Sequence, residues 1–230
     1  FSLASDFSLE WEQQVTVAGV ELIDEAKLTE NTNGNLIFAI PVKDPDNDQI
    51  SIYINEVTPT GTFLGNSSGF SSLIAPNYGS GYEFDHLTGV SLLDNGDLGL
   101  YWFDSQDSDP HSRVAKLTNG GSASAESGID NVGSSSSRDN QLIKLANGSL
   151  QTAALNTDSS EVLIQGFTSS LVVDYGYSFA TGSTIAEYAI EEKISGGSFV
   201  LLRNAENQGE VHLLSLSETG QLLWSNAYQI

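Results

Sequence analysis

The sequence contains no cysteine and no methionine, not even at position 1. Without cysteine the chain can form no disulfide framework, no thiolate metal site and no cysteine nucleophile. No apolar run reaches the roughly 20 residues that a membrane-spanning helix needs, so we expect no membrane insertion. A chain that begins at Phe1 is expected to be cut from a precursor or to be a fragment. Because removal of a signal peptide would explain the missing initiator, we expect a secreted, extracellular or cell-surface protein.

Positive charge is also scarce. Eight Lys and Arg residues stand against 30 Asp and Glu residues, and the formal net charge is −22 at pH 7. Such a surface repels phosphates and anionic lipid headgroups, which excludes nucleic acid as a partner. It attracts cations or a basic partner, and it also keeps a protein soluble in salty water. With 39% hydrophobic residues, the 230-residue chain can still bury a core.

Four similar turn signals divide the chain into units. In each, a small or polar residue stands beside a glycine, and an apolar run follows; the glycines are Gly34, Gly96, Gly148 and Gly197. Asn-Gly and Gly-Gly between apolar runs are strong hairpin signals. The spacing of roughly 50 to 60 residues is the size of a β-propeller blade.

Each unit continues in the same way. A polar, mostly acidic loop follows the apolar strand, and an alternating strand such as "ISIYINEV" or "EVLIQGF" comes next. Three units then show a second turn, while the third passes through "TSSLVVDYGYSF" instead. The pattern predicts an all-β, β-propeller-like array of about four blades of antiparallel strands, with a β-sandwich as the alternative. We expect a single repetitive domain over 1–230, with units at about 16–65, 84–121, 138–180 and 186–230.

The stretch "VHLLSLSETGQLLWS" near the end resembles secreted propeller repeats of the PQQ-like and WD40-like broad class. In those repeats a strand ends in a glycine turn and the outer strand carries tryptophan. The resemblance covers Leu28–Gly65, Leu87–Gly121 and Tyr188–Gln229. It implies a fold and no activity, because propellers have many unrelated functions. The PQQ cofactor is not implied.

Two segments carry a tryptophan of the outer-strand type, Trp11 near the start and Trp224 near the end. A closed ring uses one such strand to join its first and last blades. Residues 1–15 are therefore interpreted as an extra or exchanged outer strand. Such a strand can pair with an open edge on a neighbouring copy, which predicts self-assembly through Trp11 and Trp224. Alternatively, the strand is redundant because the array was excised from a longer one.

Alternating carboxylates in two acidic loops suggest calcium. Oxygen ligands at every second position can wrap a hard cation, and the candidates are Asp44, Asp46 and Asp48 in the first unit and Asp104, Asp107 and Asp109 in the second. The first loop lacks the glycine and the terminal Glu of an EF-hand, since Gln49 and Asn55 stand there. The alternative is a pair of solvated hairpin tips.

Other candidate sites lie in the long loops. The segment at 65–83 contains Phe70, Tyr78 and Tyr82, which could form a ligand-binding surface. Asn66 and Asn147 fit the N-glycosylation triplet. The Ser- and Gly-rich stretch at 120–140 is interpreted as a linker.

No catalytic residue is predicted, because the sequence contains no HExxH and no GxSxG. No two of the three histidines, which are His86, His111 and His212, have the sequence spacing of a metal-ligand pair. The leading hypothesis is a non-enzymatic binding or structural module that acts through loops and strand edges on a protein partner or on copies of itself. The alternative is a carbohydrate-binding, lectin-like propeller or, less favoured, a glycoside hydrolase that acts on glycans.

Overall fold

The computed structural model describes residues 2–3, 9–11, 18–48, 50–64, 73–74, 82–106, 109–118, 123–130, 141–207 and 209–230. Every regular element in these ranges is a β-strand. None of them contains a helix long and apolar enough to cross a membrane. The predicted all-β class is therefore confirmed over the described part of the chain.

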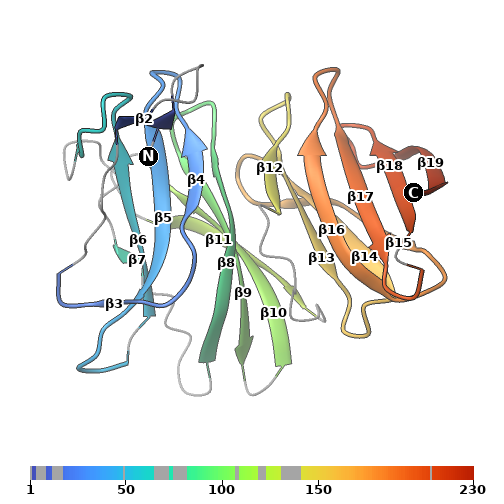
Figure 1. The fold of residues 1–230 in the computed structure, drawn as a ribbon, viewed down its shortest axis with the longest axis horizontal. Coiled ribbons are helices and arrows are strands. Elements are labelled where there is room, and N and C mark those ends of the chain that lie inside the picture. Colours follow the sequence, from blue (N-terminus) through green and yellow to red (C-terminus); the bar gives the residue numbers. More distant parts are fainter. Residues whose placement is uncertain are drawn as a thin grey trace.

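Apart from two short strands near the start, the described strands form four antiparallel sheets that follow one another along the sequence (Figure 1). We call them blades 1 to 4. Blade 1 contains β3 (Glu21–Leu22), β4 (Lys27–Glu30), β5 (Leu36–Lys43), β6 (Ile50–Val57) and β7 (Leu73–Ile74). Blade 2 contains β8 (Tyr82–Leu92), β9 (Leu98–Gln106), β10 (Asp109–Leu117) and β11 (Ala123–Asp130). Blade 3 contains β12 (Leu142–Lys144), β13 (Leu150–Leu155), β14 (Glu161–Phe167) and β15 (Val173–Ala180). Blade 4 contains β16 (Ile185–Glu192), β17 (Ser198–Asn204), β18 (Glu210–Leu216) and β19 (Leu222–Gln229).

One strand of each blade lies at the inner side of the array, namely β4, β8, β12 and β16, of which β4 is the second strand of blade 1. Strand β4 lies against β8, β8 lies against β12, and β12 lies against β16. Within each of blades 2 to 4 the remaining strands follow outward in chain order. Blades 1 and 4 lie at opposite ends of the row (Figure 1). This radial arrangement confirms a propeller-like array of four blades and sets aside the β-sandwich alternative.

The predicted inner turns are equivalent corners of one repeated motif. In each, a glycine N–H donates to the carbonyl oxygen three residues earlier, at 2.8 to 2.9 Å, and these glycines are Gly34, Gly96, Gly148 and Gly196. All four have φ between 78° and 87°, a left-handed conformation that favours glycine. In the fourth unit the equivalent residue is Gly196, not Gly197 as predicted. Gly197 also has a positive φ, of 78°, and follows the corner directly.

The third unit keeps the outer turn that its sequence was predicted to lack. Leu171 N–H donates to the Thr168 carbonyl oxygen at 2.9 Å, as Gly61 and Gly220 do to the corresponding residues of blades 1 and 4. Leu171 has φ of 58°, so a non-glycine residue occupies the left-handed position. Its side chain is 5% exposed and packs in the core, which compensates for the backbone cost. The departure predicted for this unit was wrong.

The predicted linker at 120–140 was wrong in part, whereas exchange of residues 1–15 with a neighbouring copy stays a prediction. The stretch interpreted as a linker at 120–140 contains β11, which pairs with β10 along Ala123–Asp130 and completes blade 2. Near the start, β1 (Ser2–Leu3) pairs with β2 (Leu9–Trp11) as a separate two-stranded sheet. Within the described residues, Leu9–Trp11 is therefore the edge of no blade.

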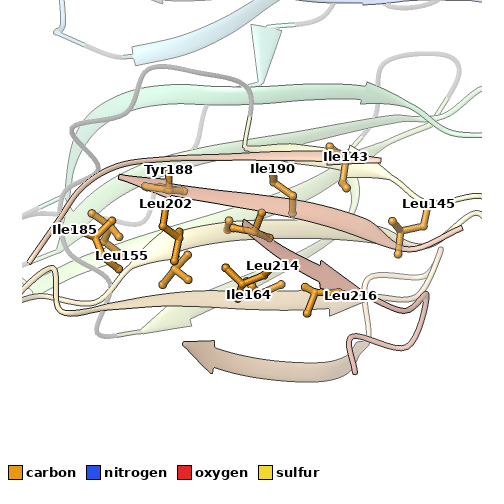
Figure 2. Packing of buried hydrophobic residues seen from close by; sticks show 13 residues of the cluster. Ile143, Leu145, Leu155, Ile164, Ile185, Tyr188, Ile190, Leu202, Leu214 and Leu216 are labelled. Carbon is orange, nitrogen blue, oxygen red and sulfur yellow. The ribbon is translucent and has the colours of Figure 1, made fainter. Parts of the chain in front are cut away.

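Neighbouring blades pack face to face, so each of the two middle blades buries both of its faces against other blades. Blades 1 and 2 share a buried cluster around Ile54 and Trp102, and blades 2 and 3 share one around Phe103 and Phe167. Figure 2 shows the third cluster, in which Ile164 of blade 3 and other side chains interdigitate with those of blade 4. Because strand residues alternate between faces, each central strand is apolar on both sides.

We expect Gly148→Ala to lower the free energy of unfolding by about 1–2 kcal/mol, because Gly148 has φ of 79°. Its added Cβ would also lie 3.2 Å from Asp94 Oδ2. The matched control is Gly176→Ala in β15, where a Cβ meets no atom within 4 Å and φ is ordinary. Urea unfolding should show little change for that variant, and equal losses for both would contradict the turn assignment.

Candidate functional site

The most exposed apolar surface of the array lies on blade 4. Along β17, Val200 and Leu202 are fully buried, while Phe199 and Leu201 are 36% and 45% exposed. Trp224 of β19 lies beside Phe199, with ring centroids 6.0 Å apart. We call this surface the open face. By its cross-strand pairs it comprises Glu187, Ala189, Glu191, Phe199, Leu201, Arg203, Val211, Leu213, Ser215, Trp224, Asn226 and Tyr228.

The open face is the counterpart of surfaces that are buried in the other blades. Counting from the equivalent inner turns, Leu201 corresponds to Ala39 of blade 1, Tyr101 of blade 2 and Ala153 of blade 3. Each of those three residues is 0% exposed and packs against the following blade. Blade 4 therefore presents a blade-packing face with nothing of the described chain packed on it.

The outer strands repeat this relationship. Tyr177 and Phe179 of β15 pack against the cluster between blades 3 and 4. The ring of Tyr175 lies so close to Gly220 of blade 4 that an added Cβ there would clash with it. Their counterparts on β19 are Trp224, Asn226 and Tyr228, and Tyr228 is 48% exposed. An apolar outer strand thus continues the open face.

Charged groups lie at the margins of the open face. Arg203 Nη2 lies 2.7 Å from Glu187 Oε1, and this bond with its charge raises the pKa of Arg203 and lowers that of Glu187. Lys193 is 8% exposed; its Nζ donates to Ser215 Oγ at 3.1 Å and lies 5.6 Å from the centre of the Phe199 ring. The centre of the face is therefore apolar and its edges are charged, as in protein interfaces.

The far face of blade 1, at the other end of the row, is covered. Phe38, Ile40 and Val42 are 4%, 6% and 1% exposed. The rings of Tyr53 and Phe63 have centroids 6.2 and 6.0 Å from that of Phe38. The two ends of the array therefore differ, because only the open face of blade 4 is exposed.

A second feature is a hollow of about 420 Å³ at the inner side, where β4, β8, β12 and β16 converge. Blade 1 contributes Thr29 and Glu30, and blade 4 contributes Glu191 and Glu192. From the middle blades, Lys144 Nζ donates to Asp94 Oδ1 at 2.5 Å and ties blade 3 to blade 2. Four carboxylates and one ammonium group are present among the described lining residues, so the hollow is acidic and polar.

The first predicted calcium loop lies in the turn between β5 and β6. Asp44 Oδ1 accepts from the Asp46 N–H at 2.9 Å, and its Oδ2 accepts from Asn47 Nδ2 at 2.9 Å. Asp48 Oδ1 lies 2.7 Å from Lys43 Nζ. In the described part of the chain, no group of three or more acidic or histidine side chains is placed to hold a metal ion. Calcium binding at this loop stays a prediction.

The second predicted loop is divided. Asp104 lies inside β9 and not in a loop, and its side chain is fully buried. Its Oδ2 accepts from Trp102 Nε1 at 3.0 Å and from Arg113 Nε at 3.1 Å. Burial raises the pKa of Asp104, and the Arg113 charge offsets only part of that rise. Asp107 lies outside the described residues, and Asp109 lies in β10.

The other predicted site residues are mostly not brought together. Phe70, Tyr78 and Asn66 lie outside the described residues, and Tyr82 lies at the start of β8. Asn147 is exposed in the inner turn of blade 3, where its Oδ1 accepts from the Ser149 N–H at 2.9 Å. Trp11 lies in β2, and Trp224 lies on the open face.

Phe199 and Leu201 were not among the site residues predicted from the sequence. Their alternation with Val200 and Leu202 is visible in "SFVLL", and it marks a strand that is apolar on both faces. That pattern indicates burial on two sides, so the exposure of one side could be recognised only from the arrangement of the blades.

Comparison with known structures supports the fold. A protein of unknown function from Dyadobacter fermentans has a TM-score of 0.54 and 11% identity, over 89% of this chain and 71% of that chain. A GH43 β-1,3-galactosidase, solved with galactodeoxynojirimycin, has a TM-score of 0.55 and 10% identity, over 89% of this chain and 75% of that chain. At such identities the similarity establishes the propeller-like fold alone. No family model and no curated protein sequence matches the chain.

If the Asp44 turn binds Ca²⁺, we expect 1 mM Ca²⁺ to raise the Tm by several degrees relative to the protein in EDTA. This size of shift assumes that 1 mM is about 100 times Kd or more. The rise should be lost in Asp44→Asn, which removes one ligand charge, and retained in Asp94→Asn outside the turn. Differential scanning calorimetry provides the measurement, and an unchanged Tm would contradict the predicted site.

We expect wild-type stability to fall relative to Asp104→Asn as pH rises above about 3.8, the ordinary value of this carboxyl. The folded state keeps the Asp104 proton to a higher pH than the unfolded state does. The resulting stabilisation is therefore complete below the ordinary pKa and is lost as the pH rises through the higher pKa of the folded state.

The control for this pH effect is Asp158→Asn. Hydrogen bonds from Ser160 lower the pKa of Asp158, so wild-type stability should instead rise relative to this variant as pH increases through the acid range. Urea midpoints across a pH series measure both differences. Parallel pH profiles for wild type and Asp104→Asn would overturn the assignment.

Proposed function

We propose that this chain is a non-enzymatic binding module that docks a polypeptide through the open face of blade 4. The observation that carries the proposal is that Phe199 and Leu201 are 36% and 45% exposed at positions that are buried in the three preceding blades. A face already shaped to pack on a β-sheet can bury apolar area on a partner without rearrangement. We place the protein outside the cell, at the cell surface or secreted.

The distribution of the ionisable groups supports a binding role over a catalytic one. Asp104 is the described carboxylate whose pKa burial raises, and it is held by Trp102 and Arg113 inside blade 2. A general acid needs its proton within reach of a substrate. The fully buried side chain of Asp104 is not accessible to one, so its raised pKa is explained as part of the packing.

A second candidate function, carbohydrate binding, is favoured by the central hollow. Hydroxyl groups of Thr29 and Ser91 line it together with the carboxylates of Glu30 and Glu192. Convergent polar groups in a concave site of this size are typical of small-ligand sites. Glu191 lines the hollow and also lies at the edge of the open face, so the two sites adjoin. Substitution of Leu201 separates the two functions, because Leu201 does not line the hollow.

To test the docking function, a phage-displayed library of β-hairpin peptides is selected on the wild-type protein. We expect apolar binders whose affinity falls at least about ten-fold on Leu201→Glu, because a carboxylate would be buried without a partner. Fluorescence titration of the selected peptides measures the loss.

The matched control is Leu22→Glu in β3, because Leu22 is 49% exposed and lies in blade 1. Peptide affinity should be unchanged by this variant. Binders that are insensitive to Leu201→Glu, or equally sensitive to both variants, would contradict docking at the open face. Glycan binding that both variants retain would instead favour the hollow.

A further inference from the structure

We propose that the occupant of the open face is the open face of a second copy of this chain. The two blades 4 pack face to face about a two-fold axis that runs along the strands. This inference rests on the proposed docking function, which it deepens by naming the partner. It starts from the repeated packing of the array, in which each earlier blade buries the equivalent surface against another sheet.

The array itself excludes a head-to-tail contact between copies. Such a contact would place the open face on the far face of blade 1, where Phe38 and Ile40 are only 4% and 6% exposed. Because that surface is covered, the matching apolar sheet that a second copy can offer is its own blade 4. A closed dimer of this kind requires a patch that is complementary to itself.

The open face meets this requirement through the order of its strands. Its cross-strand pairs form three rows, namely Glu187–Arg203–Val211–Tyr228, Ala189–Leu201–Leu213–Asn226 and Glu191–Phe199–Ser215–Trp224. The carboxylates lie on β16 at one edge, and the rings of Trp224 and Tyr228 lie on β19 at the other. The middle row places two leucines at the centre of the face.

Repulsion between carboxylates favours a two-fold axis along the strands over one across them. A two-fold axis along the strands lays β16 of each copy over β19 of the other, so that Leu201 faces Leu213 of the partner subunit. An axis across the strands lays β16 over β16 and brings Glu187 against Glu191 of the partner subunit. Like charges facing each other across an interface disfavour that second arrangement.

The size and charge of the face determine how such a dimer behaves. A sheet of four strands with roughly eight residues each covers about 500 Å² per copy, near the lower limit for specific interfaces. Each copy also carries a formal charge of −22. The dimer should therefore be weak, and salt should strengthen it by screening the repulsion. A basic partner would show the opposite salt dependence.

Sedimentation equilibrium of the full chain, from about 1 to 200 μM, tests the proposal. We expect the dimer fraction to rise with concentration and with added NaCl. Leu201→Glu should be monomeric throughout, and Leu22→Glu should behave as wild type.

Three outcomes would overturn the dimer: a wild type that is monomeric throughout, a dimer unaffected by Leu201→Glu, or a dimer that salt weakens. If the wild type is monomeric but still binds the selected hairpin peptides through Leu201, the docking function stands and the dimer alone fails. If both measurements are negative, both proposals fail.

Cross-linking tests the direction of the axis. The chain has no cysteine, so Ala189→Cys and Asn226→Cys each introduce a single thiol, on the two edge strands of the middle row. A short bis-maleimide is needed, because packed sheets lie about 10 Å apart, beyond the reach of a disulfide. We expect covalent dimers from a mixture of the two variants and few from either one alone, because three strand spacings of about 4.8 Å separate like positions laterally. Efficient cross-linking of Ala189→Cys with itself would overturn the proposed axis.

Discussion

Packing of one sheet on the next is the interaction on which the rest of this structure depends. Each central strand carries apolar side chains on both faces, as Ile37 and Phe38 do in β5, so a blade buries all of its apolar surface only when something packs on both faces. A lone sheet of four strands would leave both of these faces in water. The interior of the array follows from this constraint, since each buried cluster is built from two adjacent blades. The same constraint leaves an apolar face exposed at the end of the array where nothing of the described chain packs on it.

The ends of the array satisfy this constraint differently. At blade 1 the far face is covered, with rings of the same blade close to Phe38. At blade 4 nothing of the described chain packs on the outer face, and Leu201 remains 45% exposed. A high net negative charge keeps a molecule with such a surface soluble, because copies repel one another at low ionic strength. Acidity and the open face are therefore compatible, and together they predict association that depends on salt.

Much of the fold could be predicted from local signals. The inner turns were recognised because their left-handed positions favour glycine, and Gly34, Gly96 and Gly148 occupy them. The fourth turn was placed one residue late because two glycines, Gly196 and Gly197, stand side by side. Either can adopt the left-handed conformation, and both do, so the sequence alone could not choose between them. The outer turn of blade 3 was missed because Leu171, a residue that disfavours this conformation, is held there by burial.

Tertiary context explains what the sequence could not predict. Strand β11 reads as a linker because Ala, Ser, Glu and Gly have little preference for strands, and its pairing with β10 determines its conformation. Asp104 reads as a loop carboxylate, yet Trp102 and Arg113 hold it inside a blade. For the open face, Phe199 and Leu201 have the same alternation as buried residues, and only the absence of a following blade in the described array distinguishes them. Periodicity tells which faces of a strand are apolar, whereas exposure depends on what packs against those faces, and a site defined by exposure therefore requires the assembled array.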